Sequence, residues 1–144
     1  MEFADQLISI AQQEDIDPYW VHIEITETAI LQDMKAAKAA VQRLREAGFR
    51  IYLDDFGTGY SSLSHLSRFP LDGLKVDVSF VRDIPTSVGA CNLARGIIDL
   101  ADNLDLDVVC EGVETPEQAE FLTMAEADLL QGWYFGSAQP LPSS

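Results

Sequence analysis

Charged and polar side chains recur along this sequence, each time at or just beyond the end of a short apolar segment with strand-like composition. In a parallel sheet the carboxyl ends of the strands meet at one face, and that face carries the active site. A single carboxylate at a strand end is commonly a helix cap, but charged groups at nearly every strand end indicate a functional site. The residues are Glu24 and Glu27, Asp54 and Asp55, Lys75 and Asp77, Glu111 and Glu114, and Gln131.

The charge of such a cluster indicates its chemistry. Carboxylates that lie close together repel one another and are costly to desolvate, which is reasonable when they hold hard divalent cations. Oxygen ligands suit Mg²⁺ or Mn²⁺, and two such ions can activate a water and stabilise both oxygens of a phosphodiester hydrolysis. Lys75 would then orient the attacking water or offset negative charge. Its alternative role is a structural salt bridge within the same cluster.

The segment from Asp54 to Leu63 (Asp-Asp-Phe-Gly-Thr-Gly-Tyr-Ser-Ser-Leu) is the most specific stretch of the sequence. Successive side chains of a strand point to opposite faces, so Asp54 and Asp55 share one site only if the backbone turns there. Gly57 and Gly59 permit that turn. The triplet Asp-Phe-Gly also occurs in protein kinases, but the chain has neither the kinase glycine loop nor a His-Arg-Asp motif.

Apolar patterns predict the elements that position these residues. Strand-like composition indicates strands at residues 20–26, 49–53, 73–77, 106–110 and 129–135. Helical spacing indicates an opening helix near residues 7–11, a helix over 34–47 that Gly48 caps, and a helix from about 93 through about 103. Thr115-Pro116-Glu117-Gln118 predicts a further helix start with a capping box.

Strands that alternate with helices imply an α/β fold with a parallel sheet. At roughly 25–35 residues a unit, the 144 residues supply about five of the eight βα units of a TIM-like (β/α) barrel, for which about 250 residues are typical. The periodicity describes an open doubly wound sheet equally well.

Composition and charge exclude several other classes. The chain is 47% hydrophobic and 23% charged, as expected for one soluble globular domain, and its net charge of −15 argues against binding to a nucleic-acid polymer. Cys91 and Cys110 have no metal-binding spacing, so we expect buried free thiols in a reducing cytoplasm. No signal peptide or membrane-spanning run is expected, although a membrane-anchored parent protein stays open. The aromatic residues Trp20, Trp133, Tyr134 and Phe135 could stack on a base, but most of them are expected in the core.

Five short motifs together resemble those of the EAL domain family, which is named for a Glu-Ala-Leu motif. They occur in the family's order and span about Val21 to Pro140. The motifs are Ile23-Glu24-Ile25-Thr26-Glu27, Asp54-Asp55-Phe56-Gly57-Thr58-Gly59-Tyr60, Leu74-Lys75-Val76-Asp77, Glu111-Gly112-Val113-Glu114-Thr115 and Gln131-Gly132-Trp133-Tyr134-Phe135.

The resemblance implies a TIM-like barrel with one reversed strand, and hydrolysis of cyclic di-GMP to linear pGpG with Mg²⁺ or Mn²⁺. It implies that Glu24 and Asp54 bind one metal ion and that Asp55 serves a second. Lys75 would contact the catalytic water, and Glu111 would be the catalytic glutamate near it.

Further residues are expected to support this site or bind the substrate. The resemblance implies that Gln131 supports the site and that Glu27 anchors the loop beginning at Asp54, which also shapes the dimer surface in the family. Asp77, Gly57 and Gly59 belong to the same supporting group.

The sequence also departs from the family's pattern. The Glu-Ala-Leu motif is absent, as is a metal-binding asparagine that family members carry between that motif and the position of Glu24. Part of the ligand set of the first metal is therefore missing, and we expect residues 1–144 to be a truncated EAL domain, inactive alone.

The alternatives are a non-catalytic module that binds cyclic di-GMP or a protein partner, and a remnant with no function of its own. Open sheet edges invite pairing with another chain, so self-association is expected.

Overall fold

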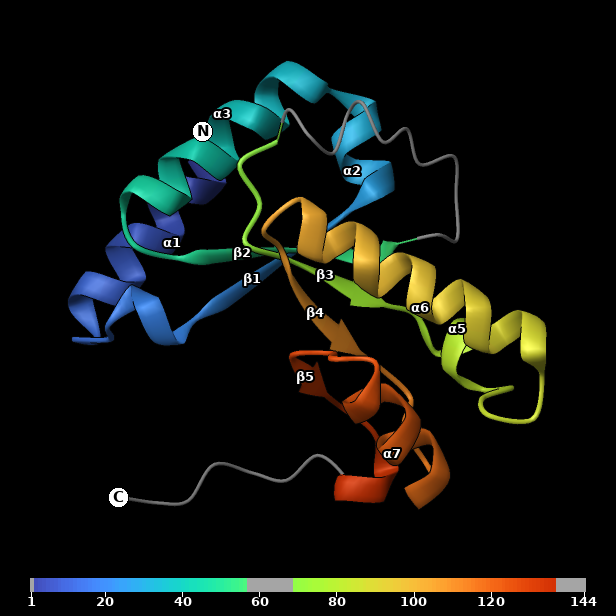
Figure 1. The fold of residues 1–144 in the computed structure, drawn as a ribbon. Coiled ribbons are helices and arrows are strands. Elements are labelled where there is room, and N and C mark those ends of the chain that lie inside the picture. The colour runs from blue at the N-terminus through green and yellow to red at the C-terminus, as the bar shows by residue number, and fades with distance from the viewer. Residues whose placement is uncertain (1, 57–68, 137–144) are drawn as a thin grey trace.

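The computed structural model describes residues 2–56 and 69–136 (Figure 1). Helices and strands alternate along the chain, and α3, α6 and α7 follow one another along the sheet. The elements are α1 (Glu2–Gln13), η1 (Pro18–Trp20), β1 (His22–Thr26), α2 (Glu27–Gln32), α3 (Met34–Glu46), β2 (Arg50–Phe56), β3 (Gly73–Val76), α5 (Val78–Val81), α6 (Val88–Asn103), β4 (Asp107–Cys110), α7 (Pro116–Met124), β5 (Leu129–Leu130) and η2 (Trp133–Phe135).

The five strands form one parallel sheet in the order β1-β2-β3-β4-β5. Each strand is added at the same edge of the sheet, next to the strand that precedes it in the chain. A doubly wound sheet instead reverses its strand order at a switch point. The sequential order therefore identifies the fold as a partial TIM-like barrel and decides between the two architectures that the periodicity left open.

The two faces of the sheet differ in chemistry. One face packs into the apolar core with the helices, through residues such as Leu53, Leu74 and Val108. The alternate residues of the same strands form the opposite face, which we call the inner face: His22, Glu24, Arg50, Tyr52, Asp54, Gly73, Lys75, Asp107, Val109 and Leu129. The inner face carries charged side chains, unlike the apolar strands of a parallel sheet that helices cover on both sides.

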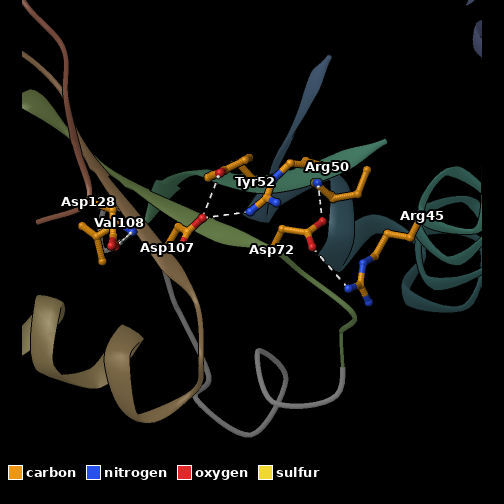
Figure 2. Close-up of polar contacts among 8 residues, drawn as sticks. Arg45, Arg50, Tyr52, Asp72, Asp107, Val108 and Asp128 are labelled. Atoms are coloured by element: carbon orange, nitrogen blue, oxygen red, sulfur yellow. Dashed lines mark hydrogen bonds and ion pairs between the residues drawn. The ribbon is translucent and has the colours of Figure 1, made fainter. Parts of the chain in front are cut away.

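Aspartates fix the strand register at the amino-terminal ends of the strands (Figure 2). Asp72 precedes β3, and its carboxylate accepts a hydrogen bond of 2.8 Å from the Ile51 amide of β2 and pairs with Arg45 at 3.2 Å. Asp128 precedes β5, and its carboxylate accepts a hydrogen bond of 2.7 Å from the Val108 amide of β4. Each aspartate thus holds the start of one strand against its neighbour.

Two expected strands are shorter than their sequences predicted. Residue 20 belongs to η1, which Asp17 caps by accepting a hydrogen bond from the Tyr19 amide, and β1 begins only at His22. The strand expected over 129–135 ends at Leu130, because the chain then turns into η2 through a hydrogen bond from the Phe135 amide to the Gly132 carbonyl.

Several aromatic residues are also exposed, against expectation. Trp20 is 79% exposed, and Tyr134 and Phe135 are exposed as well, so none of these three packs in the core. The side chain of Trp133 lies outside the described residues.

Other expectations are confirmed. Helix α3 and the capping box of Thr115 and Gln118 at the start of α7 are present. Cys91 and Cys110 are free and buried, and burial raises the pKa of Cys110 to about 12, so that this thiol stays neutral. Among the described residues, no helix combines the length and apolar character needed to cross a membrane.

Candidate functional site

A buried lysine joins three strands at the carboxyl end of the inner face. Lys75 of β3 is only 7% exposed, and its Nζ forms an ion pair of 2.7 Å with Oε1 of Glu111, which directly follows β4. The same Nζ also contacts Oε1 of Glu24 on β1. The fold therefore brings together residues separated in sequence by most of the chain, as the sequence predicted for Glu24, Lys75 and Glu111.

Each charge in this cluster changes the ionisation of the others. Burial alone lowers the pKa of Lys75, but its hydrogen bonds to Glu111 and Glu24 outweigh burial and raise that pKa above its ordinary value. Burial raises the pKa of Glu111; Lys75 opposes that rise, while the charges of Asp54 and Glu24 add to it. Lys75 therefore stays an ammonium ion, and Glu111 becomes a stronger proton acceptor than an exposed glutamate.

Asp54 lies at a break in the regular pairing of β2. Leu53 pairs with Leu74 and Phe56 pairs with Val76, so β2 has one more residue than β3 between these two pairs. Such a bulge breaks the strict alternation of faces, which is the condition under which Asp54 and Asp55 can serve one site. The side chain of Asp55, and Gly57 and Gly59, lie outside the described residues.

A cavity of about 270 Å³ opens on the inner face beside this cluster. Glu24, Lys75 and Gln131 all line this cavity. A small polar molecule bound there would therefore contact a cation and a carboxylate together. The lining residues are His22, Glu24, Tyr52, Lys75, Val109, Leu129, Leu130 and Gln131.

Gly112 and Gln118 hold the turn that carries Glu111. Gly112 has φ +76, and a Cβ there would lie 2.2 Å from Cγ2 of Val78, so only glycine fits this turn. The Gln118 side chain is buried, accepts a hydrogen bond of 2.8 Å from the Glu114 amide and donates one of 3.2 Å to the Val81 carbonyl. The capping-box pattern revealed Gln118, but nothing in the sequence indicated its reach to α5.

The remaining expected residues lie around this centre. Glu27 is the first residue of α2, and the loop that it was expected to anchor extends outside the described residues. Asp77 caps α5, where its carboxylate accepts a hydrogen bond of 3.0 Å from the Ser79 amide. Gln131 is exposed and lines the cavity. Their supporting roles stay predictions.

The described side chains do not complete a metal site. Among them, no three histidine, cysteine, aspartate or glutamate side chains gather closely enough to hold an ion. Glu24 and Glu111 are both bonded to Lys75, which uses carboxylate oxygens that a cation would need. Glu24 and Asp54 would therefore need further ligands to bind a divalent ion.

Sequence comparison finds one family and several curated relatives that are similar to the chain. A family model described as "EAL domain" matches residues 1–138. The chain is 44% identical over 138 residues to "Cyclic di-GMP phosphodiesterase NbdA" of Pseudomonas aeruginosa, covering 96% of this chain and 17% of the relative. It is 37% identical over 147 residues to "Cyclic di-GMP phosphodiesterase PdeR" of Escherichia coli, covering 99% of this chain and 22% of the relative. The chain thus spans about a fifth of the length of these relatives.

Solved structures share the fold. The structure described as "PaMucR Phosphodiesterase, c-di-GMP complex" superposes with a TM-score of 0.88 at 34% identity, over 94% of this chain and 55% of that one. A manganese and cyclic di-GMP complex of Klebsiella pneumoniae BlrP1 superposes with a TM-score of 0.82 at 35% identity, over 90% of this chain and 33% of that one.

Proposed function

The chain belongs to the EAL domain family, and from this premise we propose that it supplies part of a catalytic site that hydrolyses cyclic di-GMP to pGpG with a divalent cation. The observation that carries the proposal is the position of Lys75, which is buried between Glu24 and Glu111 at the carboxyl end of the strands. The names of the similar phosphodiesterases and of the similar cyclic di-GMP complexes support the choice of substrate.

In the proposed site Lys75 and Glu111 act on the attacking water. The Lys75 ammonium donates hydrogen bonds, so it orients a water molecule or a phosphate oxygen. Glu111 accepts the proton of that water, a role that its raised pKa favours because a base works best when its pKa approaches the operating pH. Their contact of 2.7 Å places the donor and the acceptor within reach of one water molecule.

We further propose that Glu24, Asp54 and Asp55 supply oxygen ligands to Mg²⁺ or Mn²⁺. Both ions prefer oxygen ligands such as carboxylates. Because the described side chains do not complete a metal site, the remaining ligands come from outside them. On this proposal residues 1–144 do not catalyse hydrolysis alone.

A second candidate function is a non-catalytic module that binds cyclic di-GMP or a protein partner. The pairing of both glutamates with Lys75 favours it, because the ammonium ion offsets part of their negative charge without any metal ion. In either case the buried free thiols suit a reducing, cytoplasmic compartment.

Calorimetric titration of the chain with cyclic di-GMP, with and without Mg²⁺ or Mn²⁺, separates the two candidates. Metal-dependent binding that weakens in Lys75→Met supports the catalytic half-site. Binding of equal strength without metal favours the non-catalytic module. If no nucleotide binds under any condition, the nucleotide-binding version of the second candidate is wrong.

We also propose that the chain associates through its open edges. In the described part of the chain, β1 pairs only with β2 and β5 pairs only with β4, so each has an edge available to another strand.

A further inference from the structure

We propose that Tyr52 is a positioning residue whose ring, seated over Gly73, separates the cluster of Lys75, Glu24 and Glu111 from the Arg50–Asp107 ion pair. Because of this separation, Lys75 pairs with Glu24 and Glu111 and not with Asp107. The inference rests on the proposed function only for its catalytic consequence; the arrangement of the side chains can be tested without it.

Tyr52 fills the middle of the inner face. It is 2% exposed, pairs with Glu24 on one side and Gly73 on the other, and stacks on His22 with ring centroids 4.6 Å apart. A Cβ on Gly73 would lie 2.2 Å from Cε1 and 2.5 Å from Cδ1 of the tyrosine ring. The ring therefore occupies the space that a side chain at residue 73 would take, and only glycine there admits it.

The hydroxyl of Tyr52 points towards the Arg50–Asp107 ion pair (Figure 2). It lies 3.4 Å from Oδ2 of Asp107, and the same oxygen accepts a hydrogen bond of 2.8 Å from Nη2 of Arg50. The ring thus has the Arg50–Asp107 pair at its hydroxyl end and the Lys75 cluster on the side of the strand carboxyl ends.

Each cation has a competing carboxylate within reach across this ring. Gly73 pairs with Asp107, so Asp107 is the diagonal neighbour of Lys75. His22 pairs with Arg50, so Arg50 is likewise the diagonal neighbour of Glu24. Diagonal neighbours in a sheet are about 7–8 Å apart, which long side chains can span. Without the ring, Lys75 could leave Glu111 for Asp107.

The consequence concerns the orientation of Lys75. An ammonium ion on a flexible stem takes whichever carboxylate is nearest, unlike the rigid fork of arginine. Displacement of a catalytic group by about 1 Å is enough to cost on the order of a hundredfold in rate. Tyr52 would prevent such a displacement without contacting the reacting atoms.

The test is to identify by NMR the carboxyl carbon to which the Lys75 ammonium is hydrogen-bonded. Lysine ¹⁵Nζ is correlated across the hydrogen bond with carboxyl ¹³C in samples labelled on glutamate or on aspartate. The chain has only three lysines, and Lys35 and Lys38 are exposed on α3, so the Lys75 signal is readily assigned. The wild-type protein and Tyr52→Phe, which retains the ring, are expected to show correlations to glutamate only.

In Tyr52→Ala the Lys75 correlation is expected to move to aspartate, and in Tyr52→Ala/Asp107→Asn it is expected to return to glutamate. Both variants have the same cavity, so a merely structural loss would not be reversed by the second substitution. If Tyr52→Ala does not fold, Tyr52→Val, whose side chain ends before the ring atoms that lie over Gly73, is expected to show the same transfer. A glutamate correlation that persists in the single variant, or fails to return in the double variant, overturns the proposal. The readout requires no hydrolysis, so it can succeed even if the proposed function fails.

Discussion

Lys75 is a cation that the fold removes from water and surrounds with negative charge. Burying an ion is costly unless it is paired and hydrogen-bonded, and Lys75 meets that condition through Glu24 and Glu111. The same contacts give the cluster its chemistry, because they fix a proton donor beside a carboxylate whose pKa is raised. At this position stability and proposed function depend on the same hydrogen bonds.

Lys75→Met should lower the free energy of unfolding by about 1–3 kcal/mol, the usual cost of leaving a buried polar group unsatisfied. Without Lys75, Glu111 has no cation to offset the cost of burying its charge. The negative charges of Glu24 and Asp54 then repel its carboxylate. Urea denaturation followed by circular dichroism measures the change.

Lys38→Met is the matched control, because it removes the same charge from an exposed position on α3. It should change the free energy of unfolding by no more than about 0.5 kcal/mol, as is usual for surface substitutions. Equal losses in the two variants would show that only net charge matters and that the contacts of Lys75 do not stabilise the fold.

At the scale of the elements, the polar residues at the strand ends predicted correctly which side chains meet. Short β-branched segments predicted the strands, and polar residues at their ends predicted which side chains would meet, as Glu24, Lys75 and Glu111 do. Helix α3 and the start of α7 were likewise readable from apolar spacing and a capping box. These features are local, so the sequence alone contains them.

What the sequence could not predict depends on contacts between distant residues. Helix α5 has four residues, too few for a helical period, and it forms where Asp77 caps its first turn. The strand expected over 129–135 is cut short by backbone hydrogen bonds, including one from Tyr134 to Val113 of a preceding turn. The packing of Tyr52 over Gly73 joins two strands and has no signature in either segment.

Two glycine-to-alanine substitutions should have opposite effects on the free energy of unfolding. Gly73→Ala should lower it by about 1–3 kcal/mol, as overpacking does, because the new Cβ would meet the Tyr52 ring and would lie 2.9 Å from the Asp107 carbonyl oxygen. Gly96→Ala in α6 should raise it by about 0.5–1 kcal/mol, since alanine is the better helix former and its Cβ would meet no atom within 4 Å. Thermal and urea unfolding compare the two variants. A neutral Gly73→Ala would mean that the tyrosine ring is not held over residue 73.

At the scale of the whole molecule, the sheet is open and its inner face is charged. Sequential strand order and the superposition on a longer phosphodiesterase chain describe part of a barrel whose remaining wall the described residues do not contain. Leu129 on β5 is 49% exposed at one edge, where a neighbouring strand would cover it.

Sedimentation velocity should therefore show association that increases with protein concentration. Leu129→Lys should shift the distribution towards monomer, because charged side chains block edge pairing. Val88→Lys, at an exposed position that begins α6, serves as the control and should leave association unchanged. A wild-type chain that stays monomeric at high concentration would contradict association through the open edges.

We have proposed that these residues supply part of a cyclic di-GMP phosphodiesterase site. The most direct measurement is chromatographic detection of pGpG after incubation with cyclic di-GMP and Mg²⁺ or Mn²⁺. It compares the chain alone with a chimera in which the chain replaces the matched part of the PaMucR phosphodiesterase, a replacement that the TM-score of 0.88 supports. We expect product from the chimera, none from the chain alone, and none from the chimera with Glu111→Ala. A folded chimera that makes no pGpG, or that makes it equally well with Glu111→Ala, would contradict this proposal.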